Sequence, residues 1–437
     1  MTSPNGSTPD GSTPDSPDTS DDTTEHREHR EHDIVVYGAT GFVGRLTAAY
    51  LAEHAPSSTR IALAGRSRSK LESARRSLPG SAAQWPLVEA DATDIDSLRR
   101  LVGSTRVVIS TVGPYAKFGL PLTVECARAG TDYVDLTGEV LFARESIDAN
   151  HDEARRSGAR IVHSCGFDSI PSDLGVHVLH EAVAADGAGE LTDTTLVVTS
   201  MRGGVSGGTV DSLRTQIDEV KKDRKLRALA ASPYSLSPDR SQEPDLGRQS
   251  DVALVNGKDI APGVEGWKAP FVMASYNTRI VRRSNALRNW AYGRTFRYRE
   301  VMSVGSSFAS PVIAGAVSAG LGAVVMGMTF APRRILDRVL PKPGDGPSTE
   351  AQENGHFTMD VYTTTTTGAK YRSRVKATGD PGYKATSVML GESALALVHN
   401  RDELPDASGV LTPATGIGNA LVTRLRGAGF DIWAKQM

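Results

Sequence analysis

The sequence predicts an α/β protein with two structural parts. The first is a doubly wound parallel sheet, and the second is an α+β part with a mixed or antiparallel sheet. Strand-like and helix-like runs alternate between residues 33 and 164, and two β-branched runs follow within residues 357–378. Repeated βα units are typical of parallel sheets with helices on both faces, whereas adjacent β-branched runs are typical of antiparallel pairs. A chain of 437 residues has room for two or three domains.

Composition narrows the class of protein. The chain has 49 basic and 51 acidic residues and a net charge of -2, so the chain as a whole shows no nucleic-acid signal. Its two cysteines, Cys126 and Cys165, lie far apart in the sequence, which argues against a disulfide framework and for a reducing compartment. No apolar run typical of a secretory signal follows Met1. We therefore expect a cytoplasmic protein.

Residues 1–32 have the composition of a disordered polar tail. The five residues 6–10 repeat directly as residues 11–15, and such polar sequence buries too little apolar surface to offset its ordering entropy. His26, His29 and His32 alternate with charged residues, a pattern more typical of a solvated linker than of a metal site. Since zinc-ligand spacing is absent elsewhere too, we predict no metal site.

Residues 33–44 carry the most informative pattern. The apolar run from Ile34 to Tyr37 predicts a buried strand, three glycines follow, and a helix-like run continues from Arg45 to Glu53. Strand, glycine turn and helix in this order form the dinucleotide-binding fingerprint of the Rossmann fold. Free N–H groups at such a helix start face the phosphates. The residues predicted to bind the cofactor here are Gly38, Ala39, Thr40, Gly41, Phe42, Val43 and Gly44.

The remaining elements follow from the same reading of periodicity. In the first part we expect strands at residues 60–65, 85–90, 106–111, 133–136 and 160–164, and helices at 69–77, 94–101, 120–129 and 143–157. In the second part we expect strands at 196–202, 357–367 and 370–378, helices at 207–231, 384–399 and 414–428, and loops at 233–263 and 341–355. Thr412 and Pro413 form a cap and first-turn pair for the last helix.

These elements divide the chain into four regions. After the tail, residues 33–170 form the predicted Rossmann domain, and residues 171–400 form the α+β part, with an apolar segment at 301–331. Residues 401–437 are predicted to be a C-terminal helix that packs back on the Rossmann domain.

The end of the second predicted strand indicates which nicotinamide cofactor binds. NAD-binding folds usually place an acidic residue there to bind the ribose 2′-hydroxyl, but this chain has Arg66 followed by Ser67 and Arg68. A guanidinium beside hydroxyl groups suits a 2′-phosphate. We therefore predict that Arg66 binds NADP(H), the alternative being that these residues only begin a solvated helix.

Further site candidates follow the other predicted strands. In a doubly wound sheet the ligand lies outside the carboxyl ends of the strands. Thr111, Val112 and Gly113 end the fourth strand there and are predicted cofactor contacts, and Tyr115 follows them. Asp168 lies in the segment after the sixth strand. We predict Tyr115 and Asp168 as the catalytic groups, although Asp168 suits a helix N-cap equally well.

Several of these motifs together resemble the saccharopine dehydrogenase-like oxidoreductases, and within them the actinobacterial trans-acting enoyl reductases. The resemblance covers about residues 33–430. It rests on the segments 36–45, 63–66, 112–115, 133–139 and 165–173, and further on 203–209, 281–286, 298–300 and 411–415.

The resemblance implies a Rossmann domain, an α+β second domain and reduction by NADPH. For the trans-acting enoyl reductases it implies an enoyl thioester linked to a polyketide or lipid, in lipid or glycolipid biosynthesis. A saccharopine-type dehydrogenase acting on an amino-acid conjugate is one alternative, but the cleft motifs lack an evident set of cations for the carboxylates of such a substrate. A membrane- or lipid-associated nucleotide-binding scaffold without catalysis is another.

Two adjacent segments bear on partners. Residues 266–300 contain eight basic residues interleaved with aromatic ones and a single acidic residue, Glu300. This pattern suits an acidic carrier protein, as of a polyketide synthase, an anionic membrane or nucleic acid, and equally a helix with arginines over the edge of a core. Nothing else in the sequence supports nucleic acid, and we predict none as a partner. Residues 301–331 contain no charged residue and suit a lipid-contacting segment, a buried helix or a membrane span. A position at the periphery of the plasma membrane and a homodimer are open alternatives.

Overall fold

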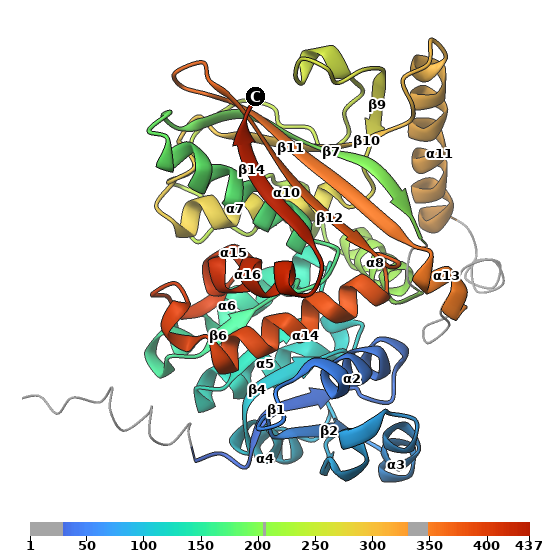
Figure 1. The fold of residues 1–437 in the computed structure, drawn as a ribbon, viewed down its shortest axis with the longest axis vertical. Helices are drawn as coiled ribbons and strands as arrows, with labels where there is room; N and C mark the ends of the chain where they lie inside the picture. Colours follow the sequence, from blue (N-terminus) through green and yellow to red (C-terminus); the bar gives the residue numbers. More distant parts are fainter. Residues whose placement is uncertain (1–28, 204–206, 331–347) are drawn as a thin grey trace, which may run out of the picture.

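The computed structural model describes residues 29–203, 207–330 and 348–437 (Figure 1). Most of the predicted tail, part of the predicted loop 341–355 and residues 204–206 of the 203–209 motif lie outside the described residues. The described end of the tail differs from the prediction, because β1 begins at His32 and Arg30 donates to the carbonyls of Ala129 and Thr105.

A seven-stranded parallel sheet, called sheet A, forms the lower half of the molecule in Figure 1. Its strand order is β13-β6-β5-β4-β1-β2-β3. Val36 in β1 lies opposite Leu63 in β2 and Ile109 in β4, so the strand order reverses between β1 and β4. Its strands are β1 (His32–Tyr37), β2 (Ile61–Gly65), β3 (Leu87–Glu89), β4 (Thr105–Ser110), β5 (Asp132–Asp135), β6 (Arg160–Val162) and β13 (Gly409–Leu411).

Helices connect these strands as predicted. They are α2 (Phe42–His54), α3 (Arg68–Arg76), α4 (Ile95–Gly103), α5 (Tyr115–Ala129) and α6 (Val140–Ser157), with a short 3-10 turn at Gly80–Gln84. Asp94 caps α4 by accepting hydrogen bonds from the N–H groups of Asp96 and Ser97. Helix α5 begins five residues earlier than the predicted start at Leu120, because the distant carboxylate of Glu139 accepts its first two N–H groups.

A second seven-stranded sheet, sheet B, forms the upper half and is mixed, as predicted. Strands β7 and β10 run parallel, and the other neighbours run antiparallel. Its strands, in spatial order, are β14 (Asp431–Gln436), β12 (Lys370–Thr378), β11 (His356–Thr365), β7 (Leu191–Arg202), β10 (Arg297–Ser303), β9 (Trp267–Pro270) and β8 (Val255–Asn256).

The two sheets share one hydrophobic core. Helices α7 (Ile170–Ala185) and α10 (Ala274–Leu287) lie on sheet B, and α14 (Lys384–His399) lies between the halves in Figure 1. Buried residues of one cluster extend from Val36 in sheet A through Leu395 in α14 to Phe357 in sheet B. The fold is therefore continuous across the predicted domain boundary.

The C-terminal region differs from the predicted single helix. Residues 409–411 add β13 to the edge of sheet A, and the chain then returns to sheet B as β14. The predicted helix 414–428 is divided into α15 (Pro413–Gly416) and α16 (Asn419–Gly427) at Gly418, whose φ of 60° lies in the left-handed region. The predicted cap is confirmed, since Thr412 and Thr415 form a reciprocal capping box.

The remaining helices belong to the second part of the chain. The predicted helix 207–231 is two helices, α8 (Gly207–Lys222) and α9 (Arg224–Ala231), because the Asp223 side chain caps a new start. Helix α11 (Ser310–Phe330) stands upright at the right edge of Figure 1, and α13 (Thr349–Glu353) precedes β11. The predicted loop 233–263 contains β8 and a short 3-10 turn at Gly257–Asp259.

Candidate functional site

The glycine loop lies where β1 meets α2, next to the point at which the strand order reverses. Gly38 has a φ of +91°, and a Cβ there would lie 2.5 Å from Oγ1 of Thr111. A Cβ on Gly44 would lie 2.2 Å from the carbonyl oxygen of Gly38. Only glycine fits at either position, so the tight turn and the close approach of α2 to β1 predicted from the sequence are confirmed.

The start of α2 is left open to a ligand. Gly41 is its N-cap, and no side chain accepts a hydrogen bond from the first turn. A helix start with free N–H groups favours phosphate binding. The other loop residues, Ala39, Thr40, Phe42 and Val43, lie in or beside this turn. The predicted residues 38–44 thus form the turn after β1 and the first residues of α2.

The other predicted cofactor residues border the same loop. The Thr111 hydroxyl donates to the carbonyl oxygen of Gly38 at 3.2 Å, and Val112 would contact a Cβ placed at Gly38. Gly113 follows them, before the turn into α5. Arg66 is exposed at the end of β2, and no hydrogen bond of its side chain is found within the described residues. Its guanidinium is therefore free to meet an anionic ligand.

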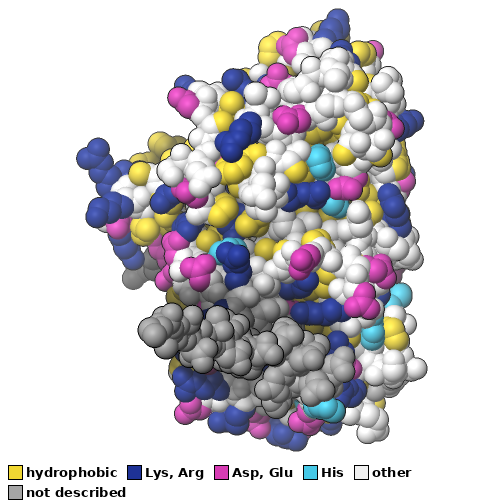
Figure 2. Space-filling view, turned by 90° about the vertical axis from the view of Figure 1, so that its left-hand side faces the viewer, with side chains coloured by type: hydrophobic (Ala, Val, Ile, Leu, Met, Phe, Trp, Pro, Cys, Tyr) yellow, Lys and Arg dark blue, Asp and Glu magenta, His cyan; other side chains and the backbone are white. Residues whose placement is uncertain are grey.

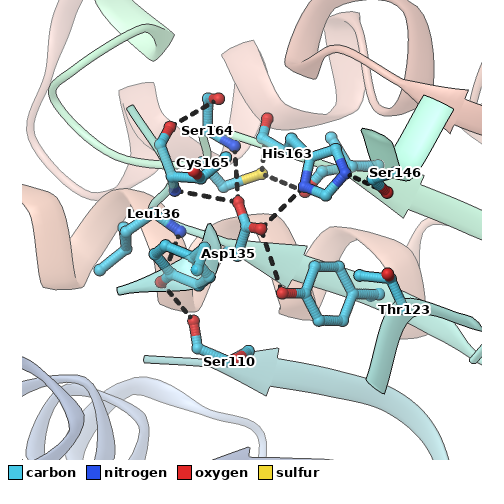
Figure 3. A network of polar contacts seen from close by, with 12 residues as sticks. Ser110, Thr123, Asp135, Leu136, Ser146, His163, Ser164 and Cys165 are labelled. Carbon is cyan, nitrogen blue, oxygen red and sulfur yellow. Dashed lines mark hydrogen bonds and ion pairs between the residues drawn. The ribbon is translucent and has the colours of Figure 1, made fainter. Parts of the chain in front are cut away.

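A buried polar network holds the carboxyl ends of β5 and β6 together (Figure 3). One carboxylate oxygen of Asp135 accepts the N–H groups of Ser164 and Thr137, at 2.9 and 3.1 Å. The other accepts the Tyr133 hydroxyl at 3.1 Å and Nδ1 of His163 at 2.7 Å. An ionised carboxylate only accepts hydrogen bonds, so His163 donates through Nδ1. The network fixes the loop that follows β6.

The same network has the connectivity of a hydrolase triad without access for a substrate. Nε2 of His163 lies 2.8 Å from Oγ of Ser146, so aspartate, histidine and serine form a chain. All three side chains are buried, and Asn150 donates to the Ser146 hydroxyl at 3.2 Å. A nucleophile has to reach its substrate. We therefore interpret this chain as a structural support for the cleft.

Tyr115, one of the two predicted catalytic residues, lies inside this support. Its hydroxyl donates to the carbonyl of Ser110 at 3.0 Å and accepts the N–H of Leu136 at 3.2 Å. Tyr115 is buried, and this burial raises its pKa well above the ordinary value. Its hydroxyl thus joins the ends of β4 and β5.

Asp168, the other predicted catalytic residue, has a different environment. Asp168 is partly buried, and no hydrogen bond to its carboxyl is found within the described part of the chain. The N-cap of α7 is Ser169, and no side chain caps that helix, so the alternative role of Asp168 as N-cap does not hold. Burial raises the pKa of Asp168 to about 6. A carboxylic acid with this pKa retains its proton closer to neutral pH than an ordinary aspartic acid.

Contacts through α14 connect the Asp168 loop to the glycine loop. The N–H of Phe167 donates to Oγ1 of Thr386 at 3.0 Å, at the start of α14. Tyr383, directly before α14, packs edge-on against Phe42, with ring centroids 4.9 Å apart. On its other side Asp168 faces the end of β5, since a Cβ on Gly138 would lie 3.7 Å from its Oδ2. The Asp168 carboxyl therefore lies near the chain that leaves β5, in a loop that α14 connects to the glycine loop.

The second part of the chain supplies residues that the sequence did not mark as site residues. The hydroxyls of Tyr276 in α10 and Ser164 lie 2.5 Å apart, and the Ser169 hydroxyl lies 3.1 Å from Oδ1 of Asn277. The Ser212 hydroxyl in α8 donates to Glu139 at 2.6 Å, and burial raises the pKa of this carboxyl. Sequence reasoning missed these residues because their partners lie 73 to 112 positions away.

A cavity of about 830 Å³ lies away from the glycine loop, between α6, α7, α15 and the loop before β13. Its Arg288 lies 2.7 Å from Nδ1 of His177 and 2.9 Å from Glu181. The polar and charged side chains of Arg288, His177 and Glu181 in this cavity thus pair with one another. None of the predicted site residues lines this cavity, and we place the functional site at the carboxyl edge of sheet A.

Comparisons with known proteins identify the family. A family model described as the saccharopine dehydrogenase NADP binding domain matches residues 34–162. The trans-acting enoyl reductase of Mycobacterium tuberculosis is 51% identical over 403 residues, which cover 91% of this chain and 96% of that protein. The trans-acting enoyl reductase of Mycobacterium ulcerans is 48% identical over 411 residues, which cover 93% and 98%.

Solved structures support the fold. The L-glutamate-forming saccharopine dehydrogenase of Saccharomyces cerevisiae matches with a TM-score of 0.50 at 13% identity, over 93% of this chain and 100% of that one. At this identity the likeness concerns the fold alone. The resemblance stated from the sequence motifs is confirmed by the family model and the mycobacterial relatives together.

Proposed function

Because the chain belongs to the trans-acting enoyl reductases, within the saccharopine dehydrogenase-like oxidoreductases, we propose that it reduces the double bond of an enoyl thioester with NADPH. The observation that carries the proposal is the open glycine loop together with the Asp168 carboxyl of raised pKa, which follows β6 at the same carboxyl edge of sheet A. The substrate would be polyketide- or lipid-linked, on a pathway to lipids or glycolipids. A polyketide synthase or its acidic carrier protein would deliver it.

The residues present fit a bound dinucleotide. The positions of Gly38 and Gly44 admit no side chain, and the open first turn of α2 offers N–H groups to a pyrophosphate. The exposed guanidinium of Arg66 suits the 2′-phosphate of NADP(H) better than the ribose hydroxyl of NAD(H). Bound NADPH supplies the hydride that reaches Cβ of the enoyl group.

We assign the proton for Cα to Asp168. The Asp168 carboxyl has no competing hydrogen bond within the described residues, whereas the Tyr115 hydroxyl donates to the Ser110 carbonyl. A general acid works best with a pKa near the working pH, and burial brings Asp168 to about 6. Tyr115 then acts by positioning the ends of β4 and β5.

Substitution of Asp168 tests this assignment. An Asp168→Asn variant should lose ~100-fold or more in kcat on an enoyl thioester of N-acetylcysteamine, while its NADPH affinity stays unchanged. The readouts are NADPH absorbance and product mass. Asp193→Asn, at an exposed position of β7, is the matched control. Wild-type activity in Asp168→Asn would show that Asp168 does not donate the proton. Turnover of saccharopine with NAD(P) by the wild-type protein would contradict the proposed enoyl reduction and favour the saccharopine-type alternative.

The pH profile separates the two predicted acids. If Asp168 donates the proton, the rate of the chemical step falls as pH rises through about 6, because the protonated form is lost. Tyr115→Phe should keep this fall. If the fall in rate with pH disappeared in Tyr115→Phe, Tyr115 would be the proton donor instead of Asp168.

Substitution of Arg66 tests the cofactor preference. Arg66→Asp should weaken NADPH binding ~tenfold or more and improve NADH binding, because hydrogen bonds to a charged group contribute roughly 1.5–3 kcal/mol. Arg76→Asp, on the last turn of α3, is the charge-matched control. Unchanged NADPH affinity in Arg66→Asp would contradict the role of Arg66.

For location we propose a cytoplasmic enzyme at the periphery of a membrane. The sequence predicts the contact within residues 266–331, but Lys268, Arg279, Arg282 and Arg283 in that range are buried. These four residues cannot reach a membrane surface, although Arg294 and Arg297 are exposed, and we propose that the apolar part of the range makes the contact. A homodimer stays an alternative, which sedimentation of the purified protein would test.

A further inference from the structure

Helix α11 exposes an apolar surface along its whole length. It is long and apolar enough to cross a membrane, with a mean hydropathy of 1.8, yet only 6% of that stretch is buried. Large exposed side chains mark both ends and the middle: Val312, Ile313, Val324, Met326 and Phe330, with Phe308 just before the helix. A continuous exposed apolar surface is typical of a binding site for protein or lipid.

The opposite side of α11 is attached to the protein at both ends. The Ser310 hydroxyl accepts the N–H of Trp267 in β9 at 3.0 Å, and Ala314 is fully buried one turn later. At the other end, Lys221 of α8 donates to the carbonyl of Thr329. A transmembrane orientation would break both attachments. The helix is thus held at its two ends, with Ala314 against the protein, and most of its surface, about 30 Å long, is open.

Positive charge lies beside the C-terminal end of this surface. Four further exposed basic residues belong to α8 or α9, next to Lys221, and the acidic residues that face them are Asp223 and, opposite Lys222, the half-buried Glu219. The four basic residues are Lys222, Arg224, Lys225 and Arg227. Helix α11 has no charged side chain of its own, so a second copy packed on it through α11 would not neutralise these cations. An anionic lipid surface satisfies both the apolar side and the adjacent cations.

We propose that α11 lies in the plane of an anionic phospholipid surface, with its exposed side in the acyl region and the α8–α9 cations on the headgroups. This goes beyond the reaction and does not depend on it. In the usual interfacial helix the polar side faces water, but here the protein body occupies that side. In contrast, the face seen in Figure 2 mixes hydrophobic side chains with charges of both signs.

Vesicle flotation with the full chain tests the proposal. The protein should float with vesicles of phosphatidylcholine and phosphatidylglycerol and float less with phosphatidylcholine alone. Val324→Glu combined with Met326→Glu should reduce the bound fraction ~tenfold or more, because two apolar anchors become charged. Val252→Glu, at an equally exposed apolar position on a loop, is the matched control and should bind like wild type.

A second variant pair tests the charge component. Lys222→Glu with Lys225→Glu should remove the preference for anionic vesicles. Absence of wild-type flotation with either vesicle, or wild-type flotation of the α11 variant, would overturn the proposal. So would a wild-type dimer that the α11 variant converts to monomer without any vesicle binding. NADPH turnover of a soluble thioester is measured on the same proteins. This activity does not need vesicles, so it shows separately whether the proposed reaction or the proposed lipid contact fails.

Discussion

Helices α10 and α11 reverse the usual relation between composition and burial. Helix α10 carries three arginines that are 2–4% exposed, whereas the charge-free α11 leaves Val312 and Phe330 76% and 74% exposed. They are separated in the chain by little more than β10. The difference teaches that burial follows the available hydrogen-bond partners and packing surface, not the polarity of the segment.

The arginines of α10 are buried because each finds backbone carbonyls. Arg283 donates to the carbonyls of Leu236 and Val410 at 2.6 Å each, and Arg282 donates to that of Tyr298 at 2.9 Å. Irregular loops leave carbonyls without partners, and a guanidinium with five donors can satisfy several of them. Helix α10 thereby ties a loop, β13 of sheet A and β10 of sheet B together. Helix α10 thus makes contacts inside the protein, whereas α11 presents its side chains to the outside.

The largest expected effect comes from removing one of these arginines. Arg283→Ala should destabilise the protein by about 3 kcal/mol or more, because two buried carbonyls lose their donor and a large side chain leaves a cavity. Urea unfolding measures the change. Arg297→Ala, at an exposed position on β10, should change stability by less than about 0.5 kcal/mol. Equal effects of the two substitutions would mean that the buried contacts of α10 contribute little.

A smaller effect is expected at Glu300, a buried carboxyl beside α10. Asn277 donates to it at 3.0 Å and Tyr298 at 2.8 Å, and burial raises its pKa to about 7. Because the folded state binds this proton more tightly than the unfolded state, the contribution is full at low pH and is lost as pH rises through about 7. Glu300→Gln keeps the shape without the charge. It should therefore be more stable than wild type at pH ~8, by on the order of 2 kcal/mol.

Unfolding at two pH values checks this expectation. The advantage of Glu300→Gln should shrink towards zero near pH ~5, where the wild-type carboxyl is protonated. Glu145→Gln, at an exposed position of α6, should show no such dependence. A difference between Glu300→Gln and wild type that is the same at both pH values would mean that this carboxyl does not titrate on unfolding.

Local patterns predicted the cofactor part of the fold well. The glycine loop, the alternating elements of sheet A and the Thr412 cap each depend on residues within about ten positions, which a sequence reading can weigh. Features that depend on distant partners were missed. Glu139 lengthens α5 across 23 to 24 positions. Asp173 accepts the N–H of Ala414 in α15 across 241 positions.

The two helices illustrate the same limit. The charges of residues 266–300 suggested a docking surface, but the partners that bury Arg283 are carbonyls, which every residue type carries and which no motif marks. For residues 301–331 the sequence left three alternatives open. The exposure of α11 argues against a buried helix, and its attachment to β9 and α8 argues against a membrane span. That attachment rests on hydrogen bonds across 43 and 108 positions.

The smallest effect is expected on α11 itself. Replacing Val312 and Phe330 by serine should change the free energy of unfolding in solution by less than about 0.5 kcal/mol each, because little of either side chain is buried in the fold. Ala314→Ser, on the buried side of the same helix, should cost more, because its hydroxyl would be placed in an apolar contact. A loss of ~2 kcal/mol for Phe330→Ser would mean that its ring is covered in solution. The contrast with α10 would then fail, because both helices would be internal.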